Sequence, residues 1–147
     1  MQASENEQRN QRTVERLVEA INTRQLAIMD ELFSDDAVMD WPKPGEQVVG
    51  AENRRAIYSR FPTLPHITPR RYLAAGDLVV LEARLDYGGP VYHSVFIFEL
   101  RDGNIARETA YWSEPFEAPA WRAEWVERGT YYTAIRLEVE GCVQRRA

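Results

Sequence analysis

The 147-residue chain has little of what disulfide, metal and membrane proteins depend on. Its one cysteine, Cys142, excludes an internal disulfide, and two histidines without clustered carboxylates argue against a metal site. No apolar run approaches the ~20 residues that span a bilayer. The polar N-terminus lacks the basic start and the apolar stretch of a signal peptide. We therefore expect a cytoplasmic protein that holds no metal and does not contact a membrane.

Positive charge is also scarce. The chain has 18 Lys and Arg against 23 Asp and Glu, a net charge of −5, so its composition gives no reason to expect nucleic-acid binding. It has no glycine-rich phosphate loop and no nucleophile elbow, so we expect no cofactor. Aromatic residues, in contrast, are plentiful: seven Tyr, five Phe and four Trp in a chain the length of one domain. Such a composition indicates a large core, an aromatic-lined cavity, or both.

Hydrophobic periodicity changes from helical to strand-like along the chain. Helical spacing predicts three N-terminal helices, at 14–21, 26–33 and 51–60. Alternating segments predict strands at 37–41, 70–75, 78–87, 91–101 and 104–113. Helices followed by antiparallel strands predict an α+β fold rather than a doubly wound sheet.

The ends of the chain are expected to differ from the middle. We predict a disordered N-terminus at 1–8, one domain at 9–128, and a C-terminal extension at 129–147 with a strand-like stretch at 131–139. The domain should end in a short helix at 118–128 that packs back on the fold. Trp121 in this helix is interpreted either as part of a cover over a pocket or as a dimer contact.

The Asp102-Gly103 pair predicts a two-residue hairpin turn, because a tight primed turn needs positive φ at both positions. This turn sets which residues of the two strands share a face. The pairs predicted to lie opposite each other on one face are His93 and Trp112, Val95 and Ala110, and Ile97 and Glu108. The residues predicted for the other face include Tyr92, Phe96, Phe98 and Tyr111. Both faces would then be apolar, and the three helices can cover only one, so we expect a homodimer through the other.

Several short motifs resemble the nuclear transport factor 2-like, or SnoaL-like, superfamily over residues 10–116. They are Asn22, Asp35-Asp36-Ala37, Gly50, Arg101-Asp102-Gly103-Asn104-Ile105 and Ala110-Tyr111-Trp112-Ser113-Glu114. The resemblance implies a cone in which three N-terminal helices pack on a curved, mostly antiparallel sheet and enclose a pocket, usually in a homodimer. The family includes ketosteroid isomerases, limonene-type epoxide hydrolases, polyketide cyclases, dehydratases and binding proteins, so the fold alone does not decide the function.

Comparison with the ketosteroid isomerases implies that this chain is not one of them. Leu17 stands where those enzymes have an oxyanion-hole tyrosine, Trp41 where they have the general-base aspartate, and Val95 where they have a protonated aspartate. That reaction needs a base at the substrate's α-proton and donors at the enolate oxygen. The same comparison implies that these three residues line the pocket.

The epoxide hydrolases match in part. Arg84-Leu85-Asp86 resembles their Arg-x-Asp dyad, and Asp40 lies in a segment similar to the one that orients their water molecule. Their second aspartate would fall at Ala110, and a water attack without its base loses ~10²–10⁴-fold. The two family comparisons disagree over whether Arg84 and Asp86 face the pocket, and this alternative stays open.

The candidate catalytic residues are His93, Glu108 and Asp40. A pocket histidine titrates near neutrality, and a carboxyl group in an apolar pocket has a raised pKa. The competing interpretations are a core histidine and a solvated carboxylate at the rim. The candidate ligand-binding residues are Leu17, Trp41, Tyr58, Val95, Ala110 and Trp112.

Two functional hypotheses remain open at the level of sequence. The first is a pocket for a small, mostly apolar molecule, with cofactor-independent acid–base chemistry of the dehydratase, isomerase, cyclase or epoxide hydrolase type. The second is a non-catalytic ligand-binding or dimeric assembly module. One cavity that contains both His93 and Glu108 would favour chemistry.

Overall fold

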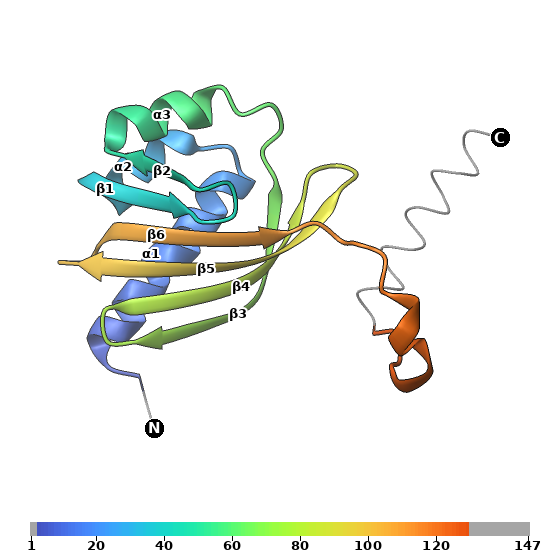
Figure 1. Ribbon diagram of the computed structural model, residues 1–147. Coiled ribbons are helices and arrows are strands. Elements are labelled where there is room, and N and C mark those ends of the chain that lie inside the picture. The colour runs from blue at the N-terminus through green and yellow to red at the C-terminus, as the bar shows by residue number, and fades with distance from the viewer. Residues whose placement is uncertain (1–2, 130–147) are drawn as a thin grey trace.

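Helices from the first half of the chain pack on one face of a six-stranded sheet in the computed structural model, which describes residues 3–129 (Figure 1). The helical segments are α1 (Glu5–Asn22), the 3-10 turn η1 (Leu26–Ile28), α2 (Met29–Leu32), α3 (Ala51–Ser59) and, after the sheet, the 3-10 helix η2 (Ala120–Trp125). The strands are β1 (Phe33–Trp41), β2 (Glu46–Val49), β3 (His66–Ala75), β4 (Leu78–Asp86), β5 (Val91–Arg101) and β6 (Asn104–Ser113).

The strand order is β2-β1-β6-β5-β4-β3, and every neighbouring pair is antiparallel except β1–β6. The predicted α+β class with N-terminal helices on a mostly antiparallel sheet is confirmed. Among the described segments, no helix is both long enough and apolar enough to cross a membrane.

Helix α1 begins earlier than the sequence predicts. The Ser4 hydroxyl caps it by accepting a hydrogen bond from the Glu7 backbone N–H at 3.1 Å, and Glu5 and Glu7 place negative charge at the positive end of the helix dipole. The prediction that residues 1–8 are disordered is therefore wrong for residues 5–8.

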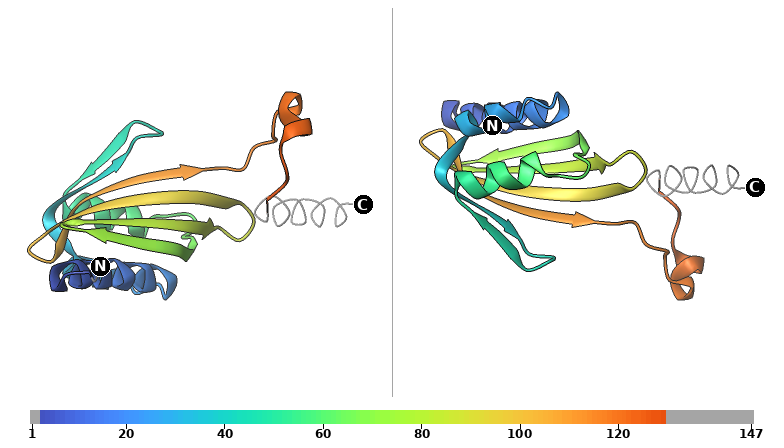
Figure 2. Two further views of the ribbon diagram at one scale, coloured as in Figure 1. Left: turned by 90° about the horizontal axis from the view of Figure 1, so that it is seen from below. Right: turned by 90° about the horizontal axis from the view of Figure 1, so that it is seen from above.

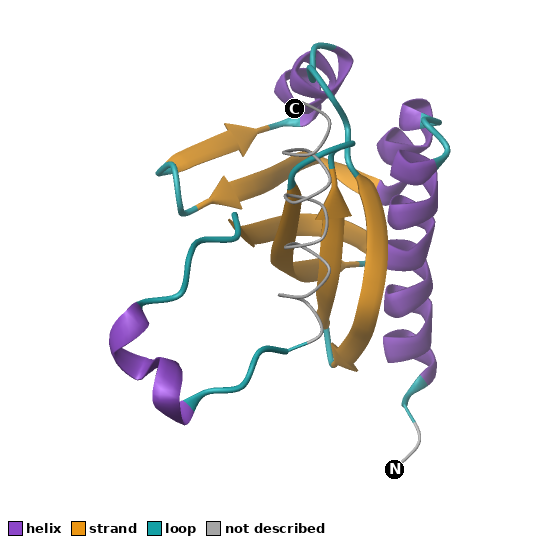
Figure 3. Ribbon diagram, turned by 90° about the vertical axis from the view of Figure 1, so that its right-hand side faces the viewer, coloured by secondary structure: helices purple, strands orange, loops and turns teal. Residues whose placement is uncertain are grey.

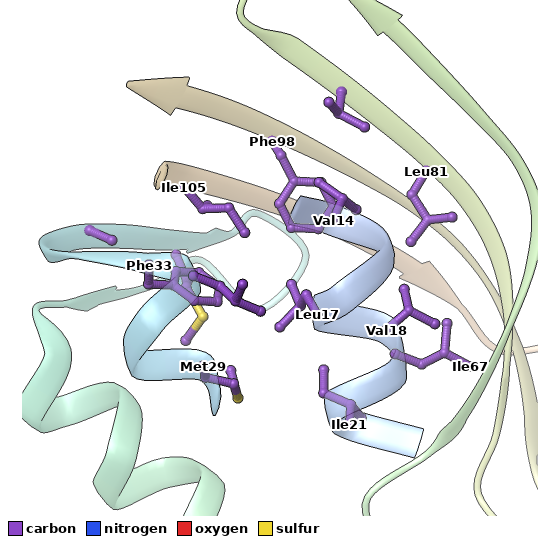
Figure 4. Close-up of a cluster of buried hydrophobic side chains, with 14 of the residues drawn as sticks. Val14, Leu17, Val18, Ile21, Met29, Phe33, Ile67, Leu81, Phe98 and Ile105 are labelled. Carbon is purple, nitrogen blue, oxygen red and sulfur yellow. The ribbon is translucent and has the colours of Figure 1, made fainter. Parts of the chain in front are cut away.

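The core lies between α1 and the sheet. Val14, Leu17, Val18 and Ile21 form the buried stripe of α1, and all four point toward the strands (Figure 4). Phe98 and other strand residues meet this stripe and complete the core. The fully buried large side chains include Phe98, Leu32, Met39, Leu81, Ile105, Val14 and Val79.

Strand boundaries differ from the predictions where pairing is non-local. Strand β1 begins at Phe33 rather than at residue 37, and the short edge strand β2 was not predicted. Strand β3 begins at His66 although it contains Pro69, because β3 is an edge strand with an irregularity between Pro69 and Arg71.

The Asp102-Gly103 turn forms as predicted, with φ of 53° and 83° and with Arg101 paired to Asn104. A β-bulge then shifts the register: Leu100 pairs with Ile105 but Glu99 pairs with Arg107, so Ala106 is the extra residue. From the bulge onward each residue of β5 lies one position away from its predicted partner. The face assignment drawn from a regular hairpin is therefore wrong beyond the first two pairs, because one extra residue turns the rest of a strand over.

The corrected register defines two faces of the sheet. The cavity face carries Glu108 opposite Phe98 and Ala110 opposite Phe96, and α1 packs on this side (Figure 2). The outer face carries Val95 opposite Tyr111. Three of the four residues predicted for the dimer surface, Tyr92, Phe96 and Phe98, thus belong to the cavity face. Only Tyr111 lies on the outer face.

A side-chain clamp fixes the end of α1 to the start of β3. The Asn22 side chain donates to the Ile67 carbonyl at 2.8 Å and accepts from the Ile67 N–H at 2.7 Å.

The Asn22→Ala variant should lose about 1–3 kcal/mol of unfolding free energy, because both backbone groups of Ile67 lose their partner. Urea denaturation of Asn22→Ala and of Thr23→Ala provides the measurement. The Thr23 hydroxyl donates to the Glu19 carbonyl of α1, a bond within one element, so an equal loss in both variants would contradict the clamp.

The segment after β6 does not pack back on the domain as predicted. It forms the short 3-10 helix η2 and stands away from the sheet (Figure 3). Trp121 and Trp125 are 74% exposed. The predicted strand-like stretch at 131–139 lies outside the described residues.

Candidate functional site

A cavity of about 730 Å³ opens between α1, α3 and the cavity face of the sheet. Its size is typical of small-molecule sites. Helix α1 contributes Leu17, Val18 and Ile21, and α3 with its following loop contributes Tyr58, Phe61 and Leu64 among others. The strands contribute Ile67, Leu81, Leu85, Phe96, Phe98, Glu108, Ala110, Trp41 and Trp112, and the residue that follows β4 contributes Tyr87. The wall is thus almost entirely apolar and aromatic.

Among the described lining residues, Glu108 is the acidic side chain that lies deep in this cavity. The other two ionised side chains of the lining, Glu46 and Arg60, are exposed at the rim. Glu108 is 5% exposed, and its place on β6 opposite Phe98 follows from the bulge at Ala106. Burial raises the pKa of Glu108 from 4.5 to about 7, and the charge of Arg54 opposes the rise. At neutral pH this carboxyl group therefore populates both its neutral and its charged form.

Tyr58 provides a second polar atom to the same cavity. Its side chain comes from α3, and its ring packs on Phe61 with centroids 5.8 Å apart. Burial raises the pKa of the Tyr58 hydroxyl far above its usual range, and the nearby Glu108 charge raises it further. The hydroxyl consequently remains a hydrogen-bond donor at every pH at which the protein would be studied.

Arg54 was not identified from the sequence, because nothing in its local motif distinguishes it from the exposed arginine that follows. The side chain is buried, with 3% of its surface exposed. Its Nη2 donates to Asp30 at 2.7 Å, and its guanidinium lies 4.7 Å from the centre of the Phe33 ring. Its Nη1 is buried and has no hydrogen-bond partner within the described part of the chain. Arg54 thus brings an internal positive charge close enough to act on Glu108.

Five of the six predicted wall residues line the cavity: Leu17, Trp41, Tyr58, Ala110 and Trp112. Trp41 and Trp112 meet edge to face with ring centroids 6.1 Å apart. The cavity also contains Phe96 and Phe98, which the sequence reasoning placed on the opposite face. The Ala106 bulge is the reason, and no local sequence signal marks it.

His93 and Val95 lie on the other side of the sheet. Both line a second hollow on the outer face, and His93 pairs with Ser113 rather than with Trp112 as predicted. The expectation that His93 and Glu108 face one pocket is therefore wrong. His93 therefore cannot act together with Glu108 in the cavity, and Val95 does not belong to the cavity wall.

Asp40 also points away from the cavity. It accepts a hydrogen bond from the Gln47 amide at 2.6 Å and forms an ion pair with Arg107 on the outer face. The Gln47 hydrogen bond and the Arg107 charge lower the pKa of Asp40. Its role in this arrangement is to link β1, β2 and β6.

The orientation of the possible dyad, which the family comparisons left open, is resolved. Leu81 and Leu85 line the cavity, so Arg84 and Asp86 face outward from the same strand. Arg84 lines the outer hollow, and Asp86 accepts a hydrogen bond from the Gly88 N–H at 2.8 Å in the turn that follows β4. No group of three or more potential metal-ligating side chains occurs in residues 3–129.

Comparisons with known proteins agree with this geometry. The family model described as a SnoaL-like domain matches residues 14–108. A nuclear transport factor 2-like protein of unknown function from Burkholderia xenovorans is 31% identical, covers 86% of this chain and 99% of its own, and superposes with a TM-score of 0.75. No curated protein matches the chain.

Two further solved structures share the fold. A provisionally named ketosteroid isomerase from Kribbella flavida is 24% identical, covers 83% of this chain and 90% of its own, and has a TM-score of 0.77. An epoxide hydrolase from Mycobacterium tuberculosis, described as LEH-like, is 21% identical, covers 72% of this chain and 84% of its own, and has a TM-score of 0.61. Because the SnoaL-like model and the relative from Burkholderia xenovorans both extend over most of the fold, the chain belongs to the SnoaL-like family of nuclear transport factor 2-like proteins.

Proposed function

We propose that this protein binds a small, mostly apolar molecule that carries one oxygen-containing polar group. The observation that carries the proposal is the combination of an apolar cavity of about 730 Å³ with a single deeply buried carboxyl group, Glu108. An apolar wall binds the body of such a molecule, and a few polar atoms fix its orientation.

The polar group is proposed to be a hydroxyl or a carbonyl. Neutral Glu108 and Tyr58 can both donate a hydrogen bond to an oxygen, and neither then carries a charge that would be costly in an apolar wall. A carboxylate or phosphate ligand is disfavoured, because the charged form of Glu108 would repel it.

Acid–base catalysis is the second candidate function, and the pKa of Glu108 favours it. A group with a pKa of about 7 can give and take a proton at neutral pH, which is the property that a general acid or base needs. Apart from Glu108, the titrating groups of the described cavity wall away from its exposed rim are the phenols of Tyr58 and Tyr87, and burial raises the pKa of both. The chemistry would therefore be limited to steps that one carboxyl group can serve, such as moving a proton between two positions of one substrate.

A pair of matched probes tests the binding proposal. At pH 6, 2-naphthol should bind about five- to tenfold more tightly than naphthalene, because naphthol can form hydrogen bonds with Glu108 and Tyr58 and naphthalene cannot. Fluorescence titration of wild-type protein and of Glu108→Leu measures both affinities. The variant should lose most of the preference for 2-naphthol, and Tyr58 accounts for any preference that remains.

Two cavity variants supply the control. Ala56→Phe places a ring in the cavity and should abolish binding of both probes, whereas Ser59→Phe, on the exposed side of α3, should leave it unchanged. Naphthol binding that survives Ala56→Phe would refute the cavity as the site. Conversion of a hydroxyl or carbonyl compound that stops in Glu108→Gln while its binding persists would favour the catalytic function.

A further inference from the structure

Arg54 is a buried cation whose hydrogen-bonding groups are only partly satisfied. Its Nη2 donates to the Asp30 carboxylate at 2.7 Å. Its Nη1 is buried and has no hydrogen-bond partner among the described residues. An unpaired charged donor is costly inside a protein, so the link to Asp30 alone does not account for an arginine at this position.

Asp30 compensates only part of this charge. The same carboxylate accepts hydrogen bonds from Nε of Arg55 at 3.0 and 3.1 Å, so two guanidinium groups share one carboxylate. The three residues therefore carry one net positive charge. The Arg55 side chain is exposed to solvent, whereas the Arg54 side chain lies inside the protein. The excess charge thus acts on the interior through Arg54.

Two contacts place the Arg54 charge near the cavity. On α3, Arg54 precedes the cavity residue Tyr58 by one helical turn, so both side chains lie on the same side of the helix. Its guanidinium packs 4.7 Å from the centre of the Phe33 ring, at the start of β1. Strand β1 pairs with β6, where Met39 lies beside Glu108. The Arg54 charge consequently acts on both Glu108 and Tyr58.

The other elements around Glu108 bring no comparable charge into the cavity within residues 3–129. Helix α1 and strand β4 face the cavity with apolar side chains, and β5 faces it with phenylalanines. Arg54 is therefore the cation that stabilises the ionised form of Glu108 from within the protein. The remaining titratable or charged groups of these elements are the phenols of Tyr58 and Tyr87, the exposed rim residues Glu46 and Arg60, and the ion pair of Asp40 with Arg107 on the outer face.

We propose that Arg54 is the buried countercharge of Glu108 and thereby selects the hydrogen-bonding character of the ligand. This inference rests on the proposed function, since it concerns the carboxyl group that would meet the ligand. Neutral Glu108 can donate a hydrogen bond to a carbonyl, whereas ionised Glu108 only accepts, for example from a hydroxyl. Arg54 favours the ionised form, so above neutral pH the cavity should prefer a hydroxyl ligand to a carbonyl ligand. Arg54 does not line the cavity and is accordingly a positioning residue.

The first measurement follows the ionisation of Glu108 without a ligand. NMR spectroscopy of isotope-labelled glutamate side chains gives a carboxyl signal for each residue, and the Glu108 signal is the one absent from Glu108→Gln. In Arg54→Met its titration midpoint should lie at least about one pH unit above the wild-type midpoint, because the ionised form loses a nearby positive charge. Arg54→Lys keeps the charge and should restore most of the difference.

Arg55→Met is the matched control. It removes the exposed arginine that binds the same Asp30 carboxylate. Its Glu108 midpoint should stay within about 0.3 pH units of the wild-type value, because solvent and salt screen an exposed charge.

The second measurement uses two probes of similar shape. 2-Acetylnaphthalene offers only a hydrogen-bond acceptor, whereas the hydroxyl of 2-naphthol can donate and accept. In the wild-type protein the affinity for 2-acetylnaphthalene should fall about three- to tenfold between about pH 6 and about pH 8.5, because ionised Glu108 cannot donate to the carbonyl. In Arg54→Met this fall should occur at least about one pH unit higher. The affinity for 2-naphthol should change less in both proteins.

Asp30→Asn tests the same coupling without altering Arg54 or the cavity wall, and it replaces Arg54→Met if that variant does not fold. It removes the negative charge that offsets Arg54. The Glu108 midpoint should therefore move down, opposite to the shift in Arg54→Met. Circular dichroism checks that each variant is folded.

The possible failures are distinguishable. An unchanged Glu108 midpoint in Arg54→Met, an equal shift in Arg55→Met, or a midpoint that does not fall in Asp30→Asn would overturn the countercharge. A shifted midpoint that leaves the pH dependence of 2-acetylnaphthalene binding unchanged would overturn the selection of ligands by Arg54. A shifted midpoint in a protein that binds neither probe would refute the proposed function itself, and with it that selection.

Discussion

The Glu108→Gln variant should be about 3 kcal/mol more stable than the wild-type protein at pH 8.5. Glutamine has the shape of glutamic acid but stays neutral, whereas the wild-type protein must bury a carboxylate above its pKa. The pKa of Glu108 rises from 4.5 to about 7 on folding, and one pKa unit corresponds to about 1.4 kcal/mol. The expected gain in stability therefore follows from the difference between the two pKa values.

The direction of the pH dependence follows from proton binding. Between pH 4.5 and about 7 the folded wild-type protein keeps the Glu108 proton and the unfolded chain releases it. Unfolding then releases a proton, so the stability of the wild-type protein falls as the pH rises through this interval. Glu108→Gln has no such proton to release, so its stability should not show this part of the decrease with pH. At pH 4.5 the two proteins should be nearly equal in stability.

Urea denaturation from pH 4.5 to 8.5 measures the difference between the two curves. Glu46→Gln is the matched control, because Glu46 lies at the exposed rim of the same cavity, and this variant should follow the wild-type curve. Parallel curves for Glu108→Gln and wild type would mean that the Glu108 carboxyl group is solvated. Both candidate functions would then lose their central residue.

The Phe98→Ala variant should lose about 3–5 kcal/mol of unfolding free energy. Phe98 is 1% exposed, stacks near Phe96 with ring centroids 6.1 Å apart, and packs against α1 (Figure 4). Removing a buried phenyl ring loses its transfer free energy and leaves a void that the neighbours fill only in part. The variant also enlarges the cavity beside Glu108.

Val95→Ala on the same strand is the matched comparison. Val95 is 37% exposed on the outer face, so its truncation should cost no more than about 0.5 kcal/mol. A regular hairpin without the bulge would reverse the two results, since it places Val95 in the core and Phe98 outside. Urea denaturation of both variants at one protein concentration decides between the two registers.

Local patterns in the sequence were sufficient for the helices and the tight turn. The apolar stripe of α1 has a period that only a helix satisfies, and Asp102-Gly103 supplies the two positive φ angles that the turn needs. The family motifs are more widely spread: Asn22 ends α1, Asp35-Asp36-Ala37 lies in β1, and Ala110-Tyr111-Trp112-Ser113-Glu114 begins in β6 and continues just beyond it. The change from helical to strand-like periodicity predicted the fold class, and the family resemblance implied most of the cavity wall, including Trp41, Tyr58 and Trp112.

The face that each strand residue occupies was decided by contacts between distant segments. The bulge at Ala106 lies where β1 also loses its register, between Phe33 and Val38 opposite β6. It therefore depends on a pairing between segments about 70 residues apart, which no local pattern of β6 reveals. That single residue separates His93 from Glu108, because a shift of one position moves every later side chain to the opposite face. Arg54 could not be identified from the sequence for a similar reason. Asp30 and Phe33, which lie on other elements, contact its buried side chain, and only the folded chain brings its charge close to Glu108.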